Sequence, residues 1–273
     1  MGRRSTRHPA TRLRLGGEPA REITTLAVEE PLEIRVGGGP YVVTMRTPGD
    51  DMALAAGHLV SEGAVWHRDH LPGICYCTTV SGRAEQDYNT LTVTLSPDVP
   101  EPRAARAATM TSACGVCGVD SIDEGRRATR FPAEPVDPLV DAPTLLALPD
   151  RLREGQALFG RTGGVHAAGL FSPAGDLLCL REDVGRHNAV DKVVGWGLRE
   201  GRLPLRGTIL QVSGRASFEL VQKASMAGIP VLSAVSAPSS LAVDLAEETR
   251  VTLIGFSRGD RATVYTHPGR IRP

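Results

Sequence analysis

The residues best suited to chemistry are two cysteines that lie three positions apart. Cys114 and Cys117 are each followed by glycine, and Ser112 and Ala113 precede the pair. No bulky neighbour crowds the sulfurs, so the sulfur atom of a partner molecule could approach them. A helix that begins near Val119 would favour thiolate over thiol through its amide dipoles. We interpret the segment as a reactive loop.

The spacing of this pair leaves three chemistries open. A structural zinc site needs two more ligands, which Cys75 and Cys77 could supply although their own spacing is short. In proteins that carry out dithiol exchange of the thioredoxin type, the motif opens a helix directly after a strand. Here the cysteine pair instead follows a proline-rich connector. A persulfide carrier accepts sulfur on one thiolate and passes it on by attack at sulfur.

A zinc deaminase also uses a cysteine pair of this spacing, together with an H-x-E motif. None of the seven histidines is followed by glutamate two positions later, and alanine precedes Cys114 where a deaminase has proline. Hydrolytic deamination is therefore not expected.

Two other segments combine residue types that are common in active sites. His166 lies in an apolar strand, where a hydrogen-bonded core histidine is the commoner role. Residues 182–192 hold acids, bases and amides at the start of a helix, and Asp183 is a candidate cap. Capping and ion pairs explain part of this density, and a functional role for Arg186 and His187 stays open.

The second half of the chain alternates strands and helices, which predicts right-handed crossovers and a mostly parallel, helix-covered sheet. Ligands of such sheets gather at the carboxyl ends of the strands. Those ends are rich in small and polar residues at 213–215, 236–240 and 257–260. Glycine, helix amides and Arg215 would form an anion cradle in the first of them. Residues 255–261 add two arginines and an aromatic ring on which a purine could stack, although an ordinary turn has the same composition.

The predicted strands, helices and loops that position these groups divide the chain into four parts. We expect a flexible basic tail at 1–20 and a small α+β unit at 21–108, which contains a hairpin and a helix after Pro48. A mobile cysteine loop and connector follow at 109–143, between proline-rich breakers. The α/β domain occupies 144–273.

The composition of the chain limits the classes of partner and the cellular location that we expect. The 31 basic and 31 acidic residues cancel, so no net field indicates nucleic acid or a membrane surface. Five cysteines in a chain of this length do not indicate a secreted disulfide framework. No apolar run is long enough to span a membrane or to follow the amino-terminal arginines as an export signal, so we expect a cytoplasmic protein.

Taken together, the motifs resemble one family, the formate dehydrogenase accessory sulfurtransferases (the FdhD family). The matching stretches are 112–118, 163–168, 182–192, 213–215 with the helix after it, 228–230 and 255–261. They occur in the order of the family and cover nearly the whole chain after the basic tail.

The resemblance implies a sulfurtransferase that takes sulfur from a cysteine desulfurase and passes it to the molybdenum cofactor before insertion into formate dehydrogenase. The cofactor, in its bis-guanine-dinucleotide form, would be bound as the substrate, with no permanent cofactor and no metal ligands. Cys114 would carry the persulfide, and Cys117 matches the second motif cysteine. The cofactor-binding stretch corresponds to Phe256, Ser257, Arg258, Gly259, Asp260 and Arg261.

The resemblance also implies a cytidine-deaminase-like α/β fold with a smaller N-terminal α+β unit, as a homodimer. Two other classes of protein stay open. One is a zinc-stabilised or dithiol redox protein, and the other is a non-catalytic chaperone of the molybdenum cofactor. The roles of Cys75 and Cys77 do not follow from the resemblance.

Overall fold

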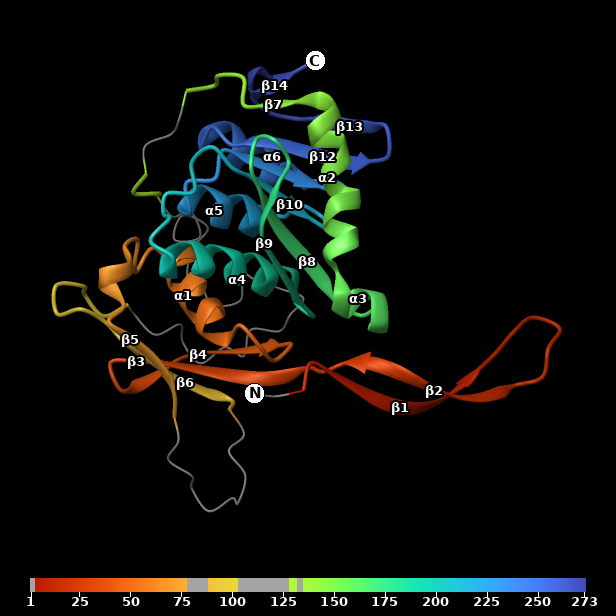
Figure 1. Cartoon of the computed structure of the whole chain (residues 1–273). Helices are drawn as coiled ribbons and strands as arrows, with labels where there is room; N and C mark the ends of the chain where they lie inside the picture. The colour runs from red at the N-terminus through yellow and green to blue at the C-terminus, as the bar shows by residue number, and fades with distance from the viewer. Residues whose placement is uncertain (1–2, 78–87, 103–127, 132–134) are drawn as a thin grey trace.

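Two β-sheets with a helical layer between them form the body of the molecule (Figure 1). The structure is a computed structural model and describes residues 3–77, 88–102, 128–131 and 135–273. Within these ranges, no helix is both long and apolar enough to cross a bilayer. Cys114, Cys117 and most of the predicted connector at 109–143 lie outside the described residues.

The larger sheet carries the α/β architecture that the sequence predicts. Its strands in spatial order are β13 (Arg261–Val264), β12 (Thr252–Arg258), β11 (Val231–Ala234), β10 (Ile209–Val212), β8 (His166–Phe171) and β9 (Leu177–Asp183). The strands β10, β11 and β12 are parallel, as expected for strand–helix–strand units. β8, β9 and β13 pair with their neighbours antiparallel, so the sheet is mixed but less parallel than predicted.

Both faces of this sheet are covered by helices, because successive strand residues alternate between two apolar faces. Leu210 and Val212 belong to the core under α4 (Arg186–Arg199), α5 (Phe218–Met226) and α6 (Ser240–Glu248). Ile209 faces the opposite core, which is closed by α2 (Ala142–Gly155). The short helix α3 (Ala157–Thr162) follows α2.

The smaller sheet belongs to the N-terminal unit. Its order is β4 (Gly39–Arg46), β3 (Glu30–Val36), β6 (Thr90–Thr94) and β5 (Gly73–Tyr76), and the predicted hairpin is β3–β4. Helix α1 (Asp51–Ser61) packs between this sheet and α4 (Figure 1). One hydrophobic core contains residues of both units, Leu32 and Leu54 as well as Val193 and Leu210. Among the described residues the N-terminal unit therefore has no separate core.

The helices α1 and α4 cross at two glycines. A Cβ atom on Gly57 would lie 1.8 Å from the carbonyl oxygen of Asp191, and one on Gly195 would lie 1.8 Å from that of Ala53. Any side chain at either position would force the helices apart. The close crossing fixes the N-terminal unit against the larger sheet.

A buried ion pair reinforces the same contact. Lys192 Nζ lies 2.7 Å from Asp183 Oδ2, and neither side chain is exposed. The ammonium also donates to the carbonyl oxygen of Thr47, and the Thr47 amide donates to Asp183. These partners satisfy charges that would be costly to bury alone.

The first 20 residues differ from the flexible tail that the sequence predicts. Strand β1 (Ser5–Arg12) pairs antiparallel with β2 (Ala20–Ala27) in a two-stranded hairpin, which we call the N-terminal arm. The arm projects from the body beyond α3 (Figure 1). Its basic, polar composition obscures a strand pattern, because both faces of the hairpin are solvated.

The remaining elements are η1 (Arg68–His70), η2 (Pro268–Arg270) and the pair β7 (Val140–Asp141) and β14 (Ile271–Arg272).

Candidate functional site

The loops at the carboxyl ends of the parallel strands form one continuous edge. The Ser239 amide donates to the carbonyl oxygen of Ala216, which links the loop after β10 to the loop after β11. The Phe256 amide donates to the carbonyl oxygen of Ser236, which links the loop after β11 to the end of β12. The structure therefore brings together the three polar segments that the sequence places there. We call this edge the carboxyl edge.

His166 also lies at the carboxyl edge, because β8 runs antiparallel to β10 and therefore starts there. The Ala167 amide donates to Ser213 Oγ at 2.9 Å, which holds the start of β8 against the loop after β10. Gly214 is close enough that a Cβ atom there would lie 3.4 Å from His166 Nδ1 and 3.9 Å from Arg186 Cδ. Burial, followed by the nearby Arg186 charge, lowers the pKa of His166, so the imidazole is neutral at pH 7.

Arg186 opens α4 at the same place, since β9 ends at this edge. Its Nε atom is buried and makes no hydrogen bond to any described residue. An unpaired buried guanidinium nitrogen is costly unless something accepts its proton. The orphan donor marks the His166–Arg186 corner as a place where an acceptor fits.

His187 links the amino ends of α4 and α5. Its Nε2 atom lies 3.3 Å from Ser217 Oγ and 3.7 Å from Glu219 Oε2. Hydrogen bonding from His187 is the main reason why the pKa of Glu219 falls to about 2. In a Ser–His–acid triad the acid holds the other ring nitrogen, so this arrangement does not activate the serine. Glu219 is absent from the sequence-based candidates, because its partner His187 is distant along the chain and no local sequence pattern indicates the contact.

The other polar residues of the segment 182–192 are structural. Asp183 does not cap α4, because the N-cap is Gly185, and instead binds Lys192 and the Gly185 amide. Asn188 donates to Asp183 and to the carbonyl oxygen of Met45. Two kinds of residue therefore occur in this segment. Arg186 and His187 face the carboxyl edge, whereas the other polar residues join the two units.

Asp191 has a structural role of the same kind. Lys223 Nζ lies 2.8 Å from both of its carboxylate oxygens, and Ser61 Oγ donates to it. Burial alone would raise the pKa of Asp191, but Lys223 and His58 outweigh burial and lower it to about 2. The carboxylate therefore ties α1, α4 and α5 together in its ionised form.

The predicted cofactor-binding residues 256–261 comprise the end of β12, the turn at 259–260 and the start of β13. Phe256 has a left-handed backbone with φ of 52°, next to a register shift in the β12–β13 ladder, and the residue is 40% exposed. Arg258 and Arg261 face each other across the turn, and both are exposed, as is Asp260. Ser257 is fully buried, and its hydroxyl has no hydrogen-bond partner among the described residues. A strained, exposed aromatic residue beside two cations can offer a flat surface to a nucleobase and charge to its phosphates.

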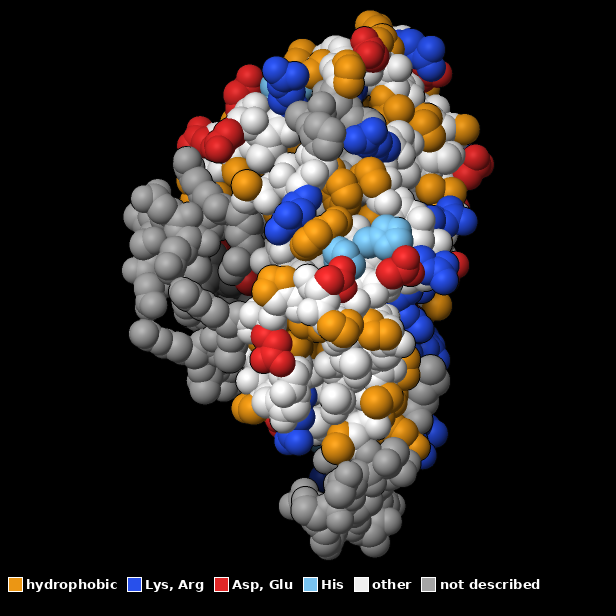
Figure 2. All heavy atoms as spheres, turned by 90° about the vertical axis from the view of Figure 1, so that its left-hand side faces the viewer, with side chains coloured by type: hydrophobic (Ala, Val, Ile, Leu, Met, Phe, Trp, Pro, Cys, Tyr) orange, Lys and Arg blue, Asp and Glu red, His pale blue; other side chains and the backbone are white. Residues whose placement is uncertain are grey.

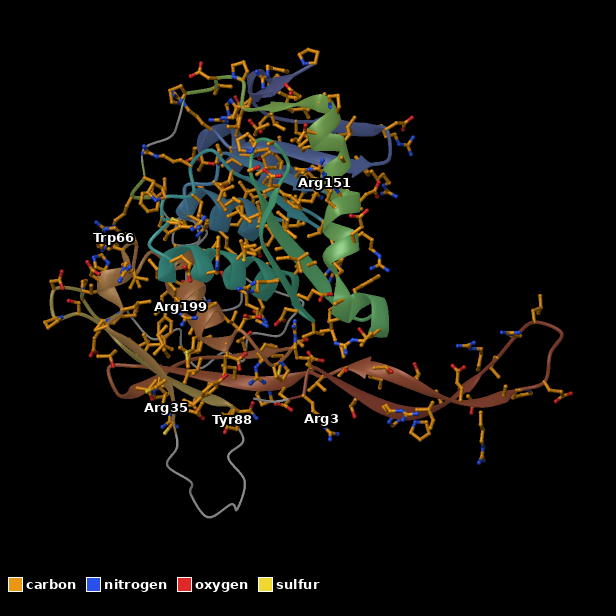
Figure 3. The ribbon with its side chains drawn as sticks, in the orientation of Figure 1. Arg3, Arg35, Trp66, Tyr88, Arg151 and Arg199 are labelled. Carbon is orange, nitrogen blue, oxygen red and sulfur yellow. The ribbon has the colours of Figure 1, made fainter. Side chains whose placement is uncertain are left out.

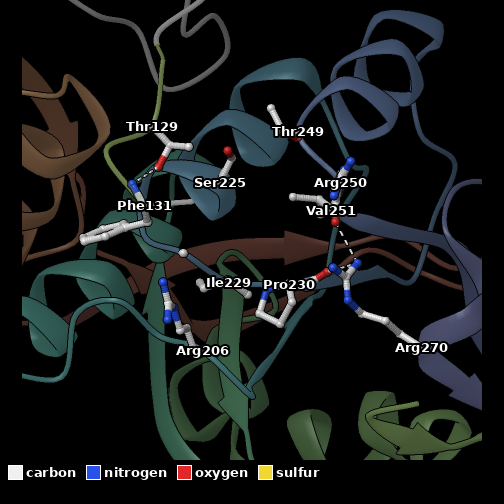
Figure 4. Close-up of a pocket in the computed structure, with 11 residues that line it drawn as sticks. Thr129, Phe131, Arg206, Ser225, Ile229, Pro230, Thr249, Arg250, Val251 and Arg270 are labelled. Carbon is white, nitrogen blue, oxygen red and sulfur yellow. Dashed lines mark hydrogen bonds between the residues drawn. The ribbon is translucent and has the colours of Figure 1, made fainter. Parts of the chain in front are cut away.

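The described residues that follow the cysteine segment lie at the opposite end of the parallel strands. Thr129 and Phe131 line a small pocket with Gly228, Ile229 and Pro230, at the start of β11 (Figure 4). Arg130 stacks on Trp66, with its guanidinium carbon 3.8 Å from the ring centroid. This end, which we call the amino edge, is separated from the carboxyl edge by the four-residue length of β11, about 13 Å.

The buried arginine of this pocket is fully engaged. Arg270 donates to the carbonyl oxygen of Arg250 at 2.7 Å and to Thr252 Oγ1 at 3.0 Å (Figure 4). A third bond reaches the carbonyl oxygen of Pro135. These contacts stabilise the C-terminal segment and leave the guanidinium little capacity for a ligand.

The second cysteine pair, Cys75 and Cys77, lies at the end of β5, and both side chains are exposed. The intervening Tyr76 donates to Asp51, which is paired with the buried Arg46. The described ranges contain no cluster of three metal-ligating side chains. A zinc site shared with Cys114 and Cys117 involves residues outside those ranges and stays an open alternative.

The face seen in Figure 2 carries cationic, acidic and hydrophobic side chains side by side. Near the middle of this face, histidine side chains lie next to acidic ones (Figure 2). At the start of η1, His67 Nδ1 lies 3.3 Å from Asp69 Oδ2. No single sign of charge dominates this face, which agrees with the balanced composition.

Comparison with known proteins gives matches along nearly the whole chain. The model of the FdhD/NarQ family matches residues 27–272. The sulfur carrier protein FdhD of Streptomyces avermitilis is 54% identical over 274 residues, which cover 99% of this chain and 97% of that protein. The protein of the same name from Mycobacterium tuberculosis is 51% identical and covers 90% of this chain. A crystal structure from Desulfotalea psychrophila, described as a formate dehydrogenase accessory protein, superposes with a TM-score of 0.76 at 25% identity and covers 98% of this chain.

Proposed function

Because this chain belongs to the FdhD/NarQ family, we propose that it is a sulfur carrier that acts in the maturation of formate dehydrogenase. The observation that carries the proposal is the extended likeness to sulfur carrier proteins in a chain that also holds the Cys114–Cys117 pair. The sulfur donor is a cysteine desulfurase. The acceptor is the molybdenum cofactor in its bis-guanine-dinucleotide form, bound as substrate.

Cys114 is the carrier in this proposal. Its thiolate attacks the outer sulfur of the donor's persulfide, so that a new S–S bond forms at Cys114 and the donor's cysteine leaves as a thiolate. This exchange is redox-neutral. In the second step the S–S bond breaks, its electron pair returns to Cys114, and the metal supplies the two electrons that turn the transferred sulfur into sulfide. Cys117 is the second thiol of the loop and assists one of these exchanges.

The carboxyl edge is the proposed binding surface for the cofactor. Phe256 offers a ring for one guanine, and Arg258 and Arg261 offer cations for the adjoining phosphates. Three strand spacings, about 14 Å, separate the start of β8 from the end of β12, so an elongated polyanion can reach both Phe256 and the His166–Arg186 corner. The orphan Arg186 donor supports an acceptor group at that corner.

The test of this function is maturation of formate dehydrogenase in cells that lack their own carrier. We expect wild-type protein to restore formate dehydrogenase activity and Cys114→Ala to restore none, because a chain without the carrier thiol has no atom to load. Cys75→Ala with Cys77→Ala is the matched control and should restore activity like the wild type. Rescue by Cys114→Ala would instead indicate a chaperone that shelters the cofactor without carrying sulfur.

A further inference from the structure

The outer face of the smaller sheet carries two thiols side by side. Cys75 and Cys77 are both exposed, and their side chains share a face because they are two positions apart in extended backbone. The intervening Tyr76 points to the opposite face, where it donates to Asp51 in α1 at 3.0 Å. Figure 3 shows Arg35, which shares the face of the thiols, at the lower side of the sheet, away from the helical layer.

The backbone under both thiols is fixed by strand pairing. Cys75 lies opposite Thr92 of β6, and the Cys77 amide donates to the carbonyl oxygen of Thr90 at 2.9 Å. Side chains two positions apart on a strand have Cβ atoms about 6.6 Å apart. A disulfide needs Cβ atoms about 3.5–4.5 Å apart, so these two cysteines cannot bond to each other while the strand keeps its geometry.

The same separation fits one metal ion between the two sulfur atoms. Staggered rotamers that lean toward each other bring each Sγ atom about 1 Å closer to the other. The sulfurs are then about 4.6 Å apart, which is twice the length of a metal–thiolate bond of about 2.3 Å. An ion in this position has one thiolate on each side, in a nearly linear arrangement.

The type and number of ligands favour Cu(I) over other metal ions. Among the described residues, no third metal-ligating side chain completes a cluster with this pair. Structural zinc takes four ligands, and calcium and magnesium take oxygen ligands. Thiolates are soft ligands that suit Cu(I), which is stable between two of them.

A nearby cation favours the thiolate form that binds a metal. Arg35 lies across the sheet from Cys75, because both residues pair with Thr92. The pKa of Arg35 is raised, first by its hydrogen bond of 2.7 Å to Glu33 and also by Cys77, so the guanidinium is within electrostatic reach of that sulfur. Positive charge beside a cysteine stabilises its thiolate.

We propose that Cys75 and Cys77 bind one Cu(I) ion between their sulfur atoms, on the outer face of the smaller sheet. Each thiol releases its proton to solvent on binding, and the oxidation state of the copper does not change. The site is separate from the proposed sulfur carriage on Cys114. A chain with Cys75→Ala and Cys77→Ala should therefore lose the copper and still restore formate dehydrogenase.

The test is Cu(I) binding to the full-length protein with Cys114→Ala and Cys117→Ala, which removes the other cysteine pair. Competition with a coloured Cu(I) chelator, without oxygen, measures the affinity, and we expect one ion per chain. Further replacement of Cys75 or Cys77 by alanine should weaken binding about a hundredfold or more, because one thiolate cannot form the bridge. Thr92→Ala is the matched control on the same face and should leave the affinity unchanged.

X-ray absorption at the copper edge gives a second readout, in which we expect two sulfur neighbours and no third ligand. Circular dichroism confirms that the variants are folded, as expected for exposed positions. Copper that stays bound after Cys75 and Cys77 are both replaced would overturn the proposal. Binding that is lost with Cys114 and Cys117 would overturn it as well, since the metal would then belong to a site shared by four cysteines.

Discussion

At the scale of single residues, the most informative feature is the backbone of Phe256. A left-handed conformation costs a residue with a Cβ atom about 1 kcal/mol, and such strain persists only where the surroundings impose it. Here the amide hydrogen bond to Ser236 and the irregular β12–β13 ladder impose it. The same geometry directs an aromatic ring to the surface of the carboxyl edge. Strain and exposure at one residue, next to two arginines, are what we expect of a binding position.

This strain leads to a prediction about stability. Replacing Phe256 by glycine should give a protein that is about 1 kcal/mol more stable than Phe256→Ala, because glycine adopts a positive φ without penalty. The measurement is the midpoint of urea unfolding for both variants. Equal stability, or a more stable alanine variant, would contradict the assignment of strain to this residue.

A second readout at Phe256 concerns the ligand. Both variants should bind guanosine diphosphate, as a probe for one end of the cofactor, about tenfold more weakly than the wild type, since stacking on an aromatic ring contributes about 1–3 kcal/mol per base. Phe159→Ala is the matched control, because Phe159 in α3 stacks on Arg153 in α2 and its amide binds Glu182 of β9, which lies four strand positions away from β12. Unchanged affinity in Phe256→Ala, measured by calorimetry, would remove Phe256 from the binding surface.

The motif around residues 182–192 shows how far single residues can be assigned from sequence. Its density of polar groups is evident in the chain, but their roles depend on contacts with Thr47, Met45 and Ser61, far away in the sequence. Asp183 is therefore assigned wrongly as a cap. His166 is placed in a strand correctly, whereas its position at the carboxyl edge depends on the direction of β8, which no local pattern encodes.

At the scale of elements, the order of strands and helices follows from sequence because apolar periodicity and turn residues are local signals. The β8–β9 hairpin, the β10–α5–β11–α6–β12 succession and the β3–β4 hairpin all agree with the prediction. The sequence pattern does not predict the antiparallel edge strand β13, because the polar residues 257–260 before it resemble a terminal loop. It does not predict the N-terminal arm either, since a solvated hairpin has no apolar face whose period could indicate strands.

The crossing of α1 and α4 is the element-scale feature that most constrains the fold. Gly195→Ala should cost about 3 kcal/mol or more, because its Cβ would collide with the backbone oxygen of Ala53 and the helices would have to separate. Gly160→Ala is a matched control in α3, where a Cβ meets no atom within 4 Å, and it should be neutral or stabilising by up to about 1 kcal/mol. Urea unfolding of both variants measures the difference. Similar stability in the two would show that the helices can move apart at little cost.

At the scale of the whole molecule, the two ends of the larger sheet carry different sets of residues. The carboxyl edge gathers His166, Arg186, Phe256 and two further arginines. The amino edge holds the residues that follow the cysteine segment. In the proposed function, sulfur arrives on the cysteine segment and meets the cofactor held by the body. The division of the chain into a carrier segment and a binding body is consistent with this sequence of events.

The resemblance to the FdhD family is a more specific argument for sulfur transfer than the spacing of the cysteines. The spacing alone leaves zinc binding and dithiol exchange open. Family membership rests on likeness along the whole body. The proposed carrier role of Cys114 rests on the resemblance of segment 112–118 to the family's motif. The remaining cysteines provide internal controls. Burial raises the pKa of Cys179 to about 11, so this thiol stays protonated at neutral pH and should not load sulfur.

The central claim is tested most directly by mass spectrometry of the purified protein after incubation with a cysteine desulfurase and cysteine. We predict one added sulfur atom on the peptide that contains Cys114, removable by a thiol reductant. The same label should persist in Cys75→Ala with Cys77→Ala and disappear in Cys114→Ala. A wild-type protein that acquires no sulfur on Cys114, or a Cys114→Ala variant that is loaded to the same extent, would contradict the account.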